Sequence, residues 1–321
     1  MAIPNSTYTE VLTASIDNYR DTLADNVMNN NVLLLYLKNN GNSDPADGGA
    51  KLLENLMYAE NGTFSWFSGY ETLSVESSDV LTSAQFDWKQ ANCNVTMSGL
   101  EETQNSGRSQ MFNLVKSRIK VAEITLQNNI STALFNSNTE NGGKAIGGLQ
   151  HLVADLPTTG TVGGIDASAQ TFWRNQYYDF SDNSVTASST TIMNAMNIVN
   201  LRCQRGTEKV DLVIAGETYF TYYENALQAQ QRFTQAGDGT AVGGFAGYKY
   251  KTASVFYDPG CSSTRMYMLN TKYLHFRPAK GKNFVVAKER TAINQDASIT
   301  PLFWTGNLTC SNRARQGIIV A

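Results

Sequence analysis

The sequence predicts an α+β fold, and three patterns carry that prediction. Residues 106–135 repeat apolar side chains at spacings of three and four, which is typical of one long helix. Residues 188–269 alternate between helical and strand-like segments. Residues 62–98 and 283–321 show strand patterns with turn residues between them. Strand-rich and helix-rich stretches therefore share one chain with an alternating unit, as in an α+β architecture.

The composition is unusual in its low charge. The chain has 321 residues and a formal net charge of −3, and only 17% of its residues are charged, against roughly a quarter in typical domains. Neutral polar residues replace them, with 31 Asn, 31 Thr and 25 Ser. This balance excludes a strongly basic nucleic-acid module and a highly charged disordered chain.

Membrane insertion, secretion and cysteine chemistry are not expected. The longest continuous apolar run is Val32 to Leu37, whereas a membrane span needs about 20 residues. Residues 1–6 lack the basic and apolar regions of a signal peptide. The cysteines are too far apart to suggest a metal site or, without a secretory signal, a disulfide framework. They are Cys93, Cys203, Cys261 and Cys310.

No catalytic constellation is recognisable in the sequence. The two histidines, His151 and His275, have no second histidine or nucleophile signature beside them. Motifs for a nucleophile elbow, a zinc protease, a phosphate loop or a dinucleotide turn are absent from the sequence. We therefore expect no enzyme activity, no cofactor and no metal. The alternative that stays open is a soluble α/β ligand-binding protein, or an unrecognised hydrolase with a pocket formed by residues 142–260.

The first hundred residues predict extended structure. Residues 1–60 are expected to form an irregular arm with short helical pieces, because asparagine-rich and glycine-rich stretches interrupt them. Residues 62–98 predict a long hairpin, with a turn at residues 77–79. Apolar residues alternate along both of its strands, and Phe64, Trp66 and Trp88 mark them. A two-stranded ribbon is marginally stable alone, so its aromatic face needs a partner.

The helix predicted at 106–135 would be about 45 Å long. Residues 142–180 follow as a loop-rich stretch. Next we expect a helix over 188–203, a buried strand over 211–216, a helix over 217–233, a glycine-rich loop over 236–247, and strands at 248–257 and 266–269. The final strands are expected at 284–286, 293–304 and 308–320, with a turn at residues 305–307.

The few charges are sorted along the chain. Residues 60–102 carry seven acidic groups and one basic group, whereas residues 103–120 carry four basic groups and none that is acidic. These basic residues, at the start of the predicted helix, are Arg108, Lys116, Arg118 and Lys120. The two segments are either separate solvated faces, or the acidic ribbon of one copy lies over the basic helix of another. In the second case, complementary charge would set the register of the contact.

The order of these elements resembles the major capsid proteins of tailed bacteriophages with the Hong Kong 97-type fold. Four local sequences carry the resemblance, which covers essentially the whole chain. They are Tyr58–Glu71 (YAENGTFSWFSGYE), Leu156–Asp166 (LPTTGTVGGID) together with Gly147-Gly148-Leu149, and Phe172-Trp173-Arg174-Asn175. The stretch from the Gly-Gly-Ile-Asp to the Phe-Trp-Arg-Asn sequence is the most specific part.

The resemblance implies a division of the chain into the parts of that fold. Residues 1–60 would be the N-terminal arm and 61–104 the extended E-loop. Residues 105–184 would begin the peripheral domain, with a spine helix at 106–136. Residues 185–270 would form the axial domain, and 271–321 would return to the peripheral domain as β-strands.

The resemblance also implies a function and partners. The protein would assemble with copies of itself into pentamers and hexamers that enclose double-stranded DNA in an icosahedral virion shell, built in the host bacterial cytoplasm. A separate scaffolding protein, a portal and a decoration or cement protein would be further partners. Inter-subunit contacts would involve Phe64, Trp66, Glu71, Glu76, Asp79, Trp88, Arg108, Lys116, Arg118 and Lys120. A flexible loop at the capsomere centre would use Gly237, Gly239, Gly243 and Gly244.

Overall fold

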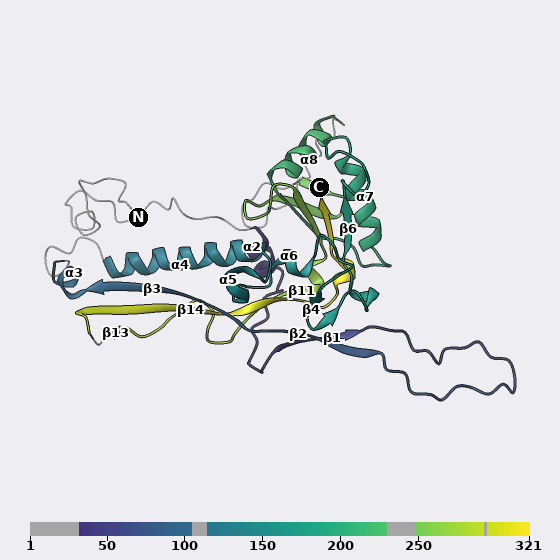
Figure 1. Cartoon of the computed structure of the whole chain (residues 1–321), viewed down its shortest axis with the longest axis horizontal. Helices are drawn as coiled ribbons and strands as arrows, with labels where there is room; N and C mark the ends of the chain where they lie inside the picture. The colour runs from purple at the N-terminus through teal and green to yellow at the C-terminus, as the bar shows by residue number, and fades with distance from the viewer. Residues whose placement is uncertain (1–31, 105–113, 230–247, 292–293) are drawn as a thin grey trace.

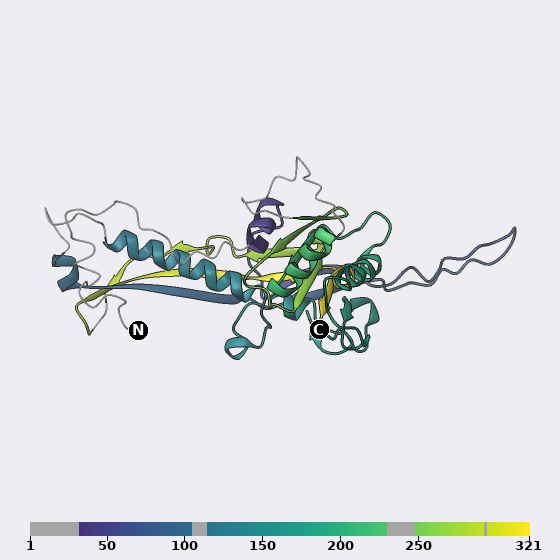
Figure 2. The ribbon, with the colours of Figure 1, turned by 90° about the horizontal axis from the view of Figure 1, so that it is seen from above.

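The computed structural model describes residues 32–104, 114–229, 248–291 and 294–321. A long limb extends to one side of the molecule, a compact unit stands above its inner end, and a hairpin arm projects to the opposite side (Figure 1). The same elongated arrangement is seen from above (Figure 2). The limb contains helix α4 (Leu114–Ala133) and strands β3 (Lys89–Ser98) and β14 (Ala297–Cys310). The compact unit contains helices α7 (Ile192–Cys203) and α8 (Glu217–Ala229). The hairpin arm (residues 52–86) contains strands β1 (Leu52–Met57) and β2 (Leu81–Phe86).

Strand β14 is the centre of the limb. It pairs antiparallel with β3 along one edge. Along its other edge it pairs with β11 (Leu274–Pro278), β12 (Val285–Val286) and β13 (Arg290–Thr291). Helix α4 runs beside β3 (Figure 1) and buries Ala122, Leu126 and Ile130 at helical spacing.

The long helix predicted from the sequence is confirmed over its described part. Helix α4 spans Leu114–Ala133, so it ends three residues before the predicted spine helix does, and residues 105–113 lie outside the described residues. Gly148 packs against the carbonyl groups at the end of the helix, where a Cβ atom would collide with them. The amide of Leu149 donates to the carbonyl of Leu134 at 2.6 Å, which helps to end the helix.

The turn predicted at residues 305–307 is wrong, because β14 runs through it. Thr305 pairs with Gln90, and Gly306 pairs with both Lys89 and Pro278. A Cβ atom on Gly306 would lie 2.7 Å from the carbonyl oxygen of Arg277. The glycine therefore serves close packing between strands, a role of strand glycines that composition does not distinguish from a turn.

The hairpin predicted at 62–98 is also placed differently. Its first strand is β1, within the predicted N-terminal arm, and β1 pairs with β2 in the register Leu52↔Phe86 to Met57↔Leu81. Residues 58–80 connect the two strands without forming a strand. The following strand, β3, pairs with β14 of the limb instead. The expected turn at residues 77–79 therefore lies inside the long connecting loop.

The compact unit is a six-stranded sheet covered by α7 and α8 on one face (Figure 1). Its strand order is β6-β15-β10-β7-β9-β8. Strand β7 (Leu212–Ala215) is buried throughout: Val213 and Ala215 face the α7 and α8 side, and Leu212 and Ile214 face the main core. A strand with two buried faces explains the continuous apolar run. The remaining strands are β6 (Gln176–Asp179), β8 (Tyr248–Tyr250), β9 (Ala253–Tyr257), β10 (Arg265–Leu269) and β15 (Gly317–Val320).

Two strands of this sheet come from segments that the sequence prediction assigned to the peripheral domain. Strand β6 lies in the range 105–184 and β15 in the range 271–321, yet both complete the sheet of the compact unit. The pairing of β15 with β6 is parallel and that with β10 is antiparallel. Such long-range pairings carry no local sequence signal, so the domain boundaries of the prediction do not match the sheets.

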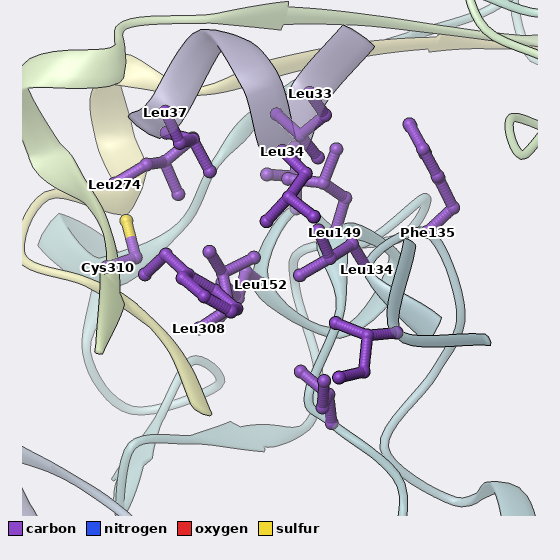
Figure 3. Close-up of a cluster of buried hydrophobic side chains, with 14 of the residues drawn as sticks. Leu33, Leu34, Leu37, Leu134, Phe135, Leu149, Leu152, Leu274, Leu308 and Cys310 are labelled. Carbon is purple, nitrogen blue, oxygen red and sulfur yellow. The ribbon is translucent and has the colours of Figure 1, made fainter. Parts of the chain in front are cut away.

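The main core joins the compact unit to the limb. Helix α2 (Val32–Asn39) inserts Leu33, Leu34 and Leu37 between residues of several distant segments (Figure 3). The side chain of Asp258 accepts from the Val32 amide at 3.1 Å at the start of this helix. The short elements around the core are α3 (Gly99–Gln104), α5 (Glu140–Gly143), α6 (Leu149–Leu152), β4 (Thr161–Val162), β5 (Ile165–Asp166), and 3-10 helices at Thr171–Trp173, Thr271–Tyr273 and Arg313–Arg315.

Candidate self-association surface

The hairpin arm exposes a large set of apolar side chains. Its inner face buries Leu52, Leu56, Ala84 and Phe86 against the body. Beyond this base the arm stands clear of the body in both views (Figures 1 and 2). The exposed apolar residues of the arm are Leu53, Met57, Tyr58, Phe64, Trp66, Phe67, Tyr70, Leu73, Val75 and Leu81. Many exposed apolar side chains gathered on one projecting arm are typical of an interaction surface.

The aromatic residues proposed from the sequence occupy different positions. Trp66 is 90% exposed and Phe64 is 74% exposed, and their rings meet edge to face with centroids 5.5 Å apart. Trp88 instead lies at the base of the arm, packed against the main core. Its indole Nε1 donates to the carbonyl of Gly49 at 2.9 Å. Trp88 therefore holds the base of the arm within its own chain.

The loop of the hairpin arm is acidic. Residues 58–80 contain no Lys or Arg, and their acidic residues are Glu60, Glu71, Glu76 and Asp79, all exposed. Glu71 accepts from the backbone amide of Ser68 at 3.0 Å, which orders part of the loop. The arm thus presents apolar side chains and negative charge together.

The basic start of α4 is partly used inside the chain. Arg118 donates to Glu101 of α3 at 2.9 and 3.1 Å, and to the carbonyl of Thr96 at 3.0 Å. Hydrogen bonding to Arg118 and to the Ser98 amide holds the pKa of Glu101 below its usual range. Lys116 and Lys120 are exposed on the same helix. An acidic and a basic residue from the two predicted segments thus pair within one chain.

Five of the predicted site residues lie outside the described residues. They are Arg108, Gly237, Gly239, Gly243 and Gly244. Sequence reasoning also missed exposed apolar residues that flank the loop, namely Leu53, Met57 and Leu81. The sequence of β1 indicates this exposure, because leucines occupy both faces of the strand. Leu52 and Leu56 are buried, whereas Leu53 is exposed.

Burial changes the acid–base properties of one histidine and three cysteines. Burial, together with Arg313 and Lys89, lowers the pKa of His151 to about 4, so this imidazole is neutral at pH 7. Burial raises the pKa values of the Cys203, Cys261 and Cys310 thiols to about 12, so these thiols stay protonated and weakly nucleophilic. His275 lies 3.6 Å from Asp44.

The described residues contain no cluster of three or more His, Cys, Asp or Glu side chains that could hold a metal ion. None of the helices in the described ranges combines the length and apolar character needed to cross a bilayer.

No protein-family model matches the chain, and no curated protein matches its sequence. Solved structures do match it along its whole length. The capsid of cyanophage A-1(L) has a TM-score of 0.68 at 15% identity, with 99% of both chains covered. The capsid of a native GTA particle has a TM-score of 0.65 at 9% identity, again with 99% of both chains covered. An encapsulin from Synechococcus elongatus has a TM-score of 0.59 at 6% identity, covering 100% of this chain and 96% of that chain.

These matches define the fold. The chain has the α+β fold of phage capsid proteins of the Hong Kong 97 type, as the sequence predicted. Since the identities are low, this likeness concerns the fold alone.

Proposed function

We propose that this protein is a major capsid protein of a tailed phage. Copies of it would assemble into pentamers and hexamers and form an icosahedral shell around double-stranded DNA. The single observation that carries the proposal is the hairpin arm, which exposes apolar side chains on a chain with the capsid fold. In a monomer these side chains would remain in water.

Covering the arm with another copy would provide the driving force for assembly. Burying one large apolar side chain contributes about 1.5–3 kcal/mol, and the arm has several of them. Part of this gain offsets the loss of rigid-body freedom and the ordering of the loop. A shell multiplies the same contact over many copies, so a modest interface between two subunits is sufficient.

Charge would set the register of that contact. The acidic loop of one copy would lie near the basic start of α4 of another, where Lys116 and Lys120 are exposed. Because Arg118 is paired with Glu101 in its own chain, it would support this surface by fixing α4 to α3. Complementary charge of this kind steers association and suppresses wrong registers more than it adds affinity.

Further partners follow from the proposal. The shell would contact DNA through electrostatic interactions without sequence preference, limited by the net charge of −3. A separate scaffolding protein and a portal would act during assembly in the host bacterial cytoplasm. A decoration or cement protein would bind the outer face of the virion. The glycine-rich segment 236–247 would lie at the centre of each capsomere.

The test is electron microscopy of the purified protein, expressed with and without its scaffolding partner. The wild type should form capsomeres or closed shells. The triple variant F64S/W66S/V75S should keep its circular dichroism spectrum and unfolding temperature but remain monomeric. The control T72A/S74A changes polar residues of the same loop and should assemble normally. Shells formed by the triple variant at the wild-type yield would contradict the proposal, as would a wild-type protein that stays a compact monomer and binds a small ligand.

The encapsulin match favours one alternative, a protein compartment around a cargo other than DNA. The contents of purified particles distinguish the two functions. Nuclease-protected double-stranded DNA inside the particles supports the capsid, whereas a protein cargo without DNA supports the compartment.

A further inference from the structure

A buried carboxylate lies at the base of the hairpin arm. Along β1 the inward positions are Leu52, Glu54 and Leu56, because alternate residues of a strand share one face. Glu54 is only 6% exposed. A leucine would continue this apolar face, whereas a buried carboxylate is costly unless it is paired and hydrogen-bonded. Packing alone therefore does not explain Glu54.

The partners of Glu54 belong to the central sheet of the limb. Its Oε1 atom accepts from Nε of Arg277 on β11 at 2.6 Å and from the hydroxyl of Thr309 on β14 at 2.7 Å. These partners lie 223 and 255 residues further along the chain. Charge-assisted hydrogen bonds are short and directional, so they fix an orientation that apolar contacts alone would leave free to slide.

Two other ion pairs lie near the base, Lys51–Asp87 at 3.5 Å and Arg205–Glu60 at 3.8 Å, and both are largely exposed to solvent. Two further hydrogen bonds there join uncharged groups. The amide of Gln85 donates to the carbonyl of Gly163 at 2.8 Å, and the Trp88 indole donates to Gly49. Because the arm is long, a small rotation at its base displaces its tip by a larger distance. Residues 54 to 69 span at most about 50 Å, so a rotation of about 10° at Glu54 would move the tip by up to about 9 Å.

We propose that Glu54, Arg277 and Thr309 form a joint that sets the direction in which the hairpin arm leaves the body. The angle is a property of the single chain. Its consequence, the choice of the surface that the arm can reach on another copy, rests on the proposed function. Glu54 is thus a positioning residue for assembly, although it would itself touch no other copy.

The angle can be measured in the unassembled protein by electron paramagnetic resonance. Spin labels at L81C, on the exposed outer end of β2, and at V121C, on the exposed side of α4, report the distance between arm and limb. The half-buried Cys93 is replaced by serine. The double variant E54L/R277L exchanges the ion pair for apolar side chains, which preserves stability in comparable cases. K51M is the control, since it removes the exposed Lys51–Asp87 pair at the same base.

We expect one narrow distance distribution for the wild type and for K51M. E54L/R277L should keep the unfolding temperature but show a shifted or broadened distribution, and its shells should be fewer or irregular. If E54L/R277L gives the same distance distribution as the wild type, the proposed joint is contradicted. If the double variant does not fold, the variant T309V provides the test. A broadened distance distribution in T309V supports the proposed joint, and an unchanged one contradicts it. Absence of shells from the wild type would contradict only the proposed function, because the distances are measured on single chains.

Discussion

Asn307 shows how a neutral side chain can join distant segments of this protein. It is 4% exposed, and its Oδ1 accepts from the amides of Gly147 and Leu308. Its Nδ2 donates to the carbonyl of Asp87 at 2.8 Å, next to the hairpin arm. The amide thus pairs with backbone groups from three parts of the chain without the desolvation cost of a charge.

The neighbouring residue provides the first prediction at the residue scale. The change G306A places a Cβ atom 2.7 Å from the Arg277 carbonyl and 2.8 Å from the Trp304 ring. Since backbone and a buried ring must shift, we expect G306A to lower the free energy of unfolding by about 1–3 kcal/mol. Urea denaturation measures this loss. The control is G62A, where an added Cβ atom would meet nothing within 4 Å, so this change should be close to neutral. Equal stabilities of G306A and G62A would contradict the explanation.

Asp258 gives a pH dependence. Burial raises its pKa from 3.8 to about 6, although the amides of Val32 and Gly260 donate to it. Because the folded pKa lies above the unfolded one, stability from this group is fully present below pH 3.8 and is lost as the pH rises through 6. When the pH is lowered from 7.5 to 5, the free energy of unfolding of the wild type should rise by about 1 kcal/mol relative to that of D258N. Urea denaturation at both pH values measures this difference. If the stabilities of the wild type and D258N change with pH in the same way, the raised pKa of Asp258 is wrong.

At the scale of elements, α4 presents Lys116 and Lys120 on its exposed side. If they receive the acidic loop of another copy, K116E/K120E should reduce the rate and yield of shells, most strongly at low salt, because salt screens surface charges. Light scattering and electron microscopy at two salt concentrations measure the effect. The control K144E/K251E reverses two exposed lysines elsewhere and should assemble like the wild type. Wild-type yields in K116E/K120E would exclude this register.

The elements that the sequence predicted well are those whose pattern is satisfied locally. Helix α7 and strand β7 were found because their apolar residues face cores within the same chain. Residues 64–75 were predicted as a strand because apolar residues alternate there, yet these side chains are exposed. Period-two patterning indicates that something will cover one face, and it does not specify whether that partner belongs to the same chain. The base of the arm was missed for a related reason, since Glu54 finds its partners more than 200 residues away.

At the scale of the whole molecule, the fold could be predicted from the sequence, whereas the strands that make up each sheet could not. Strands β6 and β15 join one sheet from opposite sides of the sequence. The low fraction of charged residues can also be explained at this scale. The exposed face of β3 carries Gln90, Asn92, Asn94 and Thr96. A surface of amides and hydroxyls suits a chain that would be covered by its own copies, because such groups can pair across a contact at less cost than buried charges.

The position of β15 has a consequence for biosynthesis. It separates β6 from β10, so the sheet of the compact unit has a gap until residues 317–320 are available. A nascent chain still held by the ribosome short of residue 320 would expose the edges of both neighbours and could not present a finished subunit. Any association that needs a finished compact unit therefore has to wait until residues 317–320 have left the ribosome.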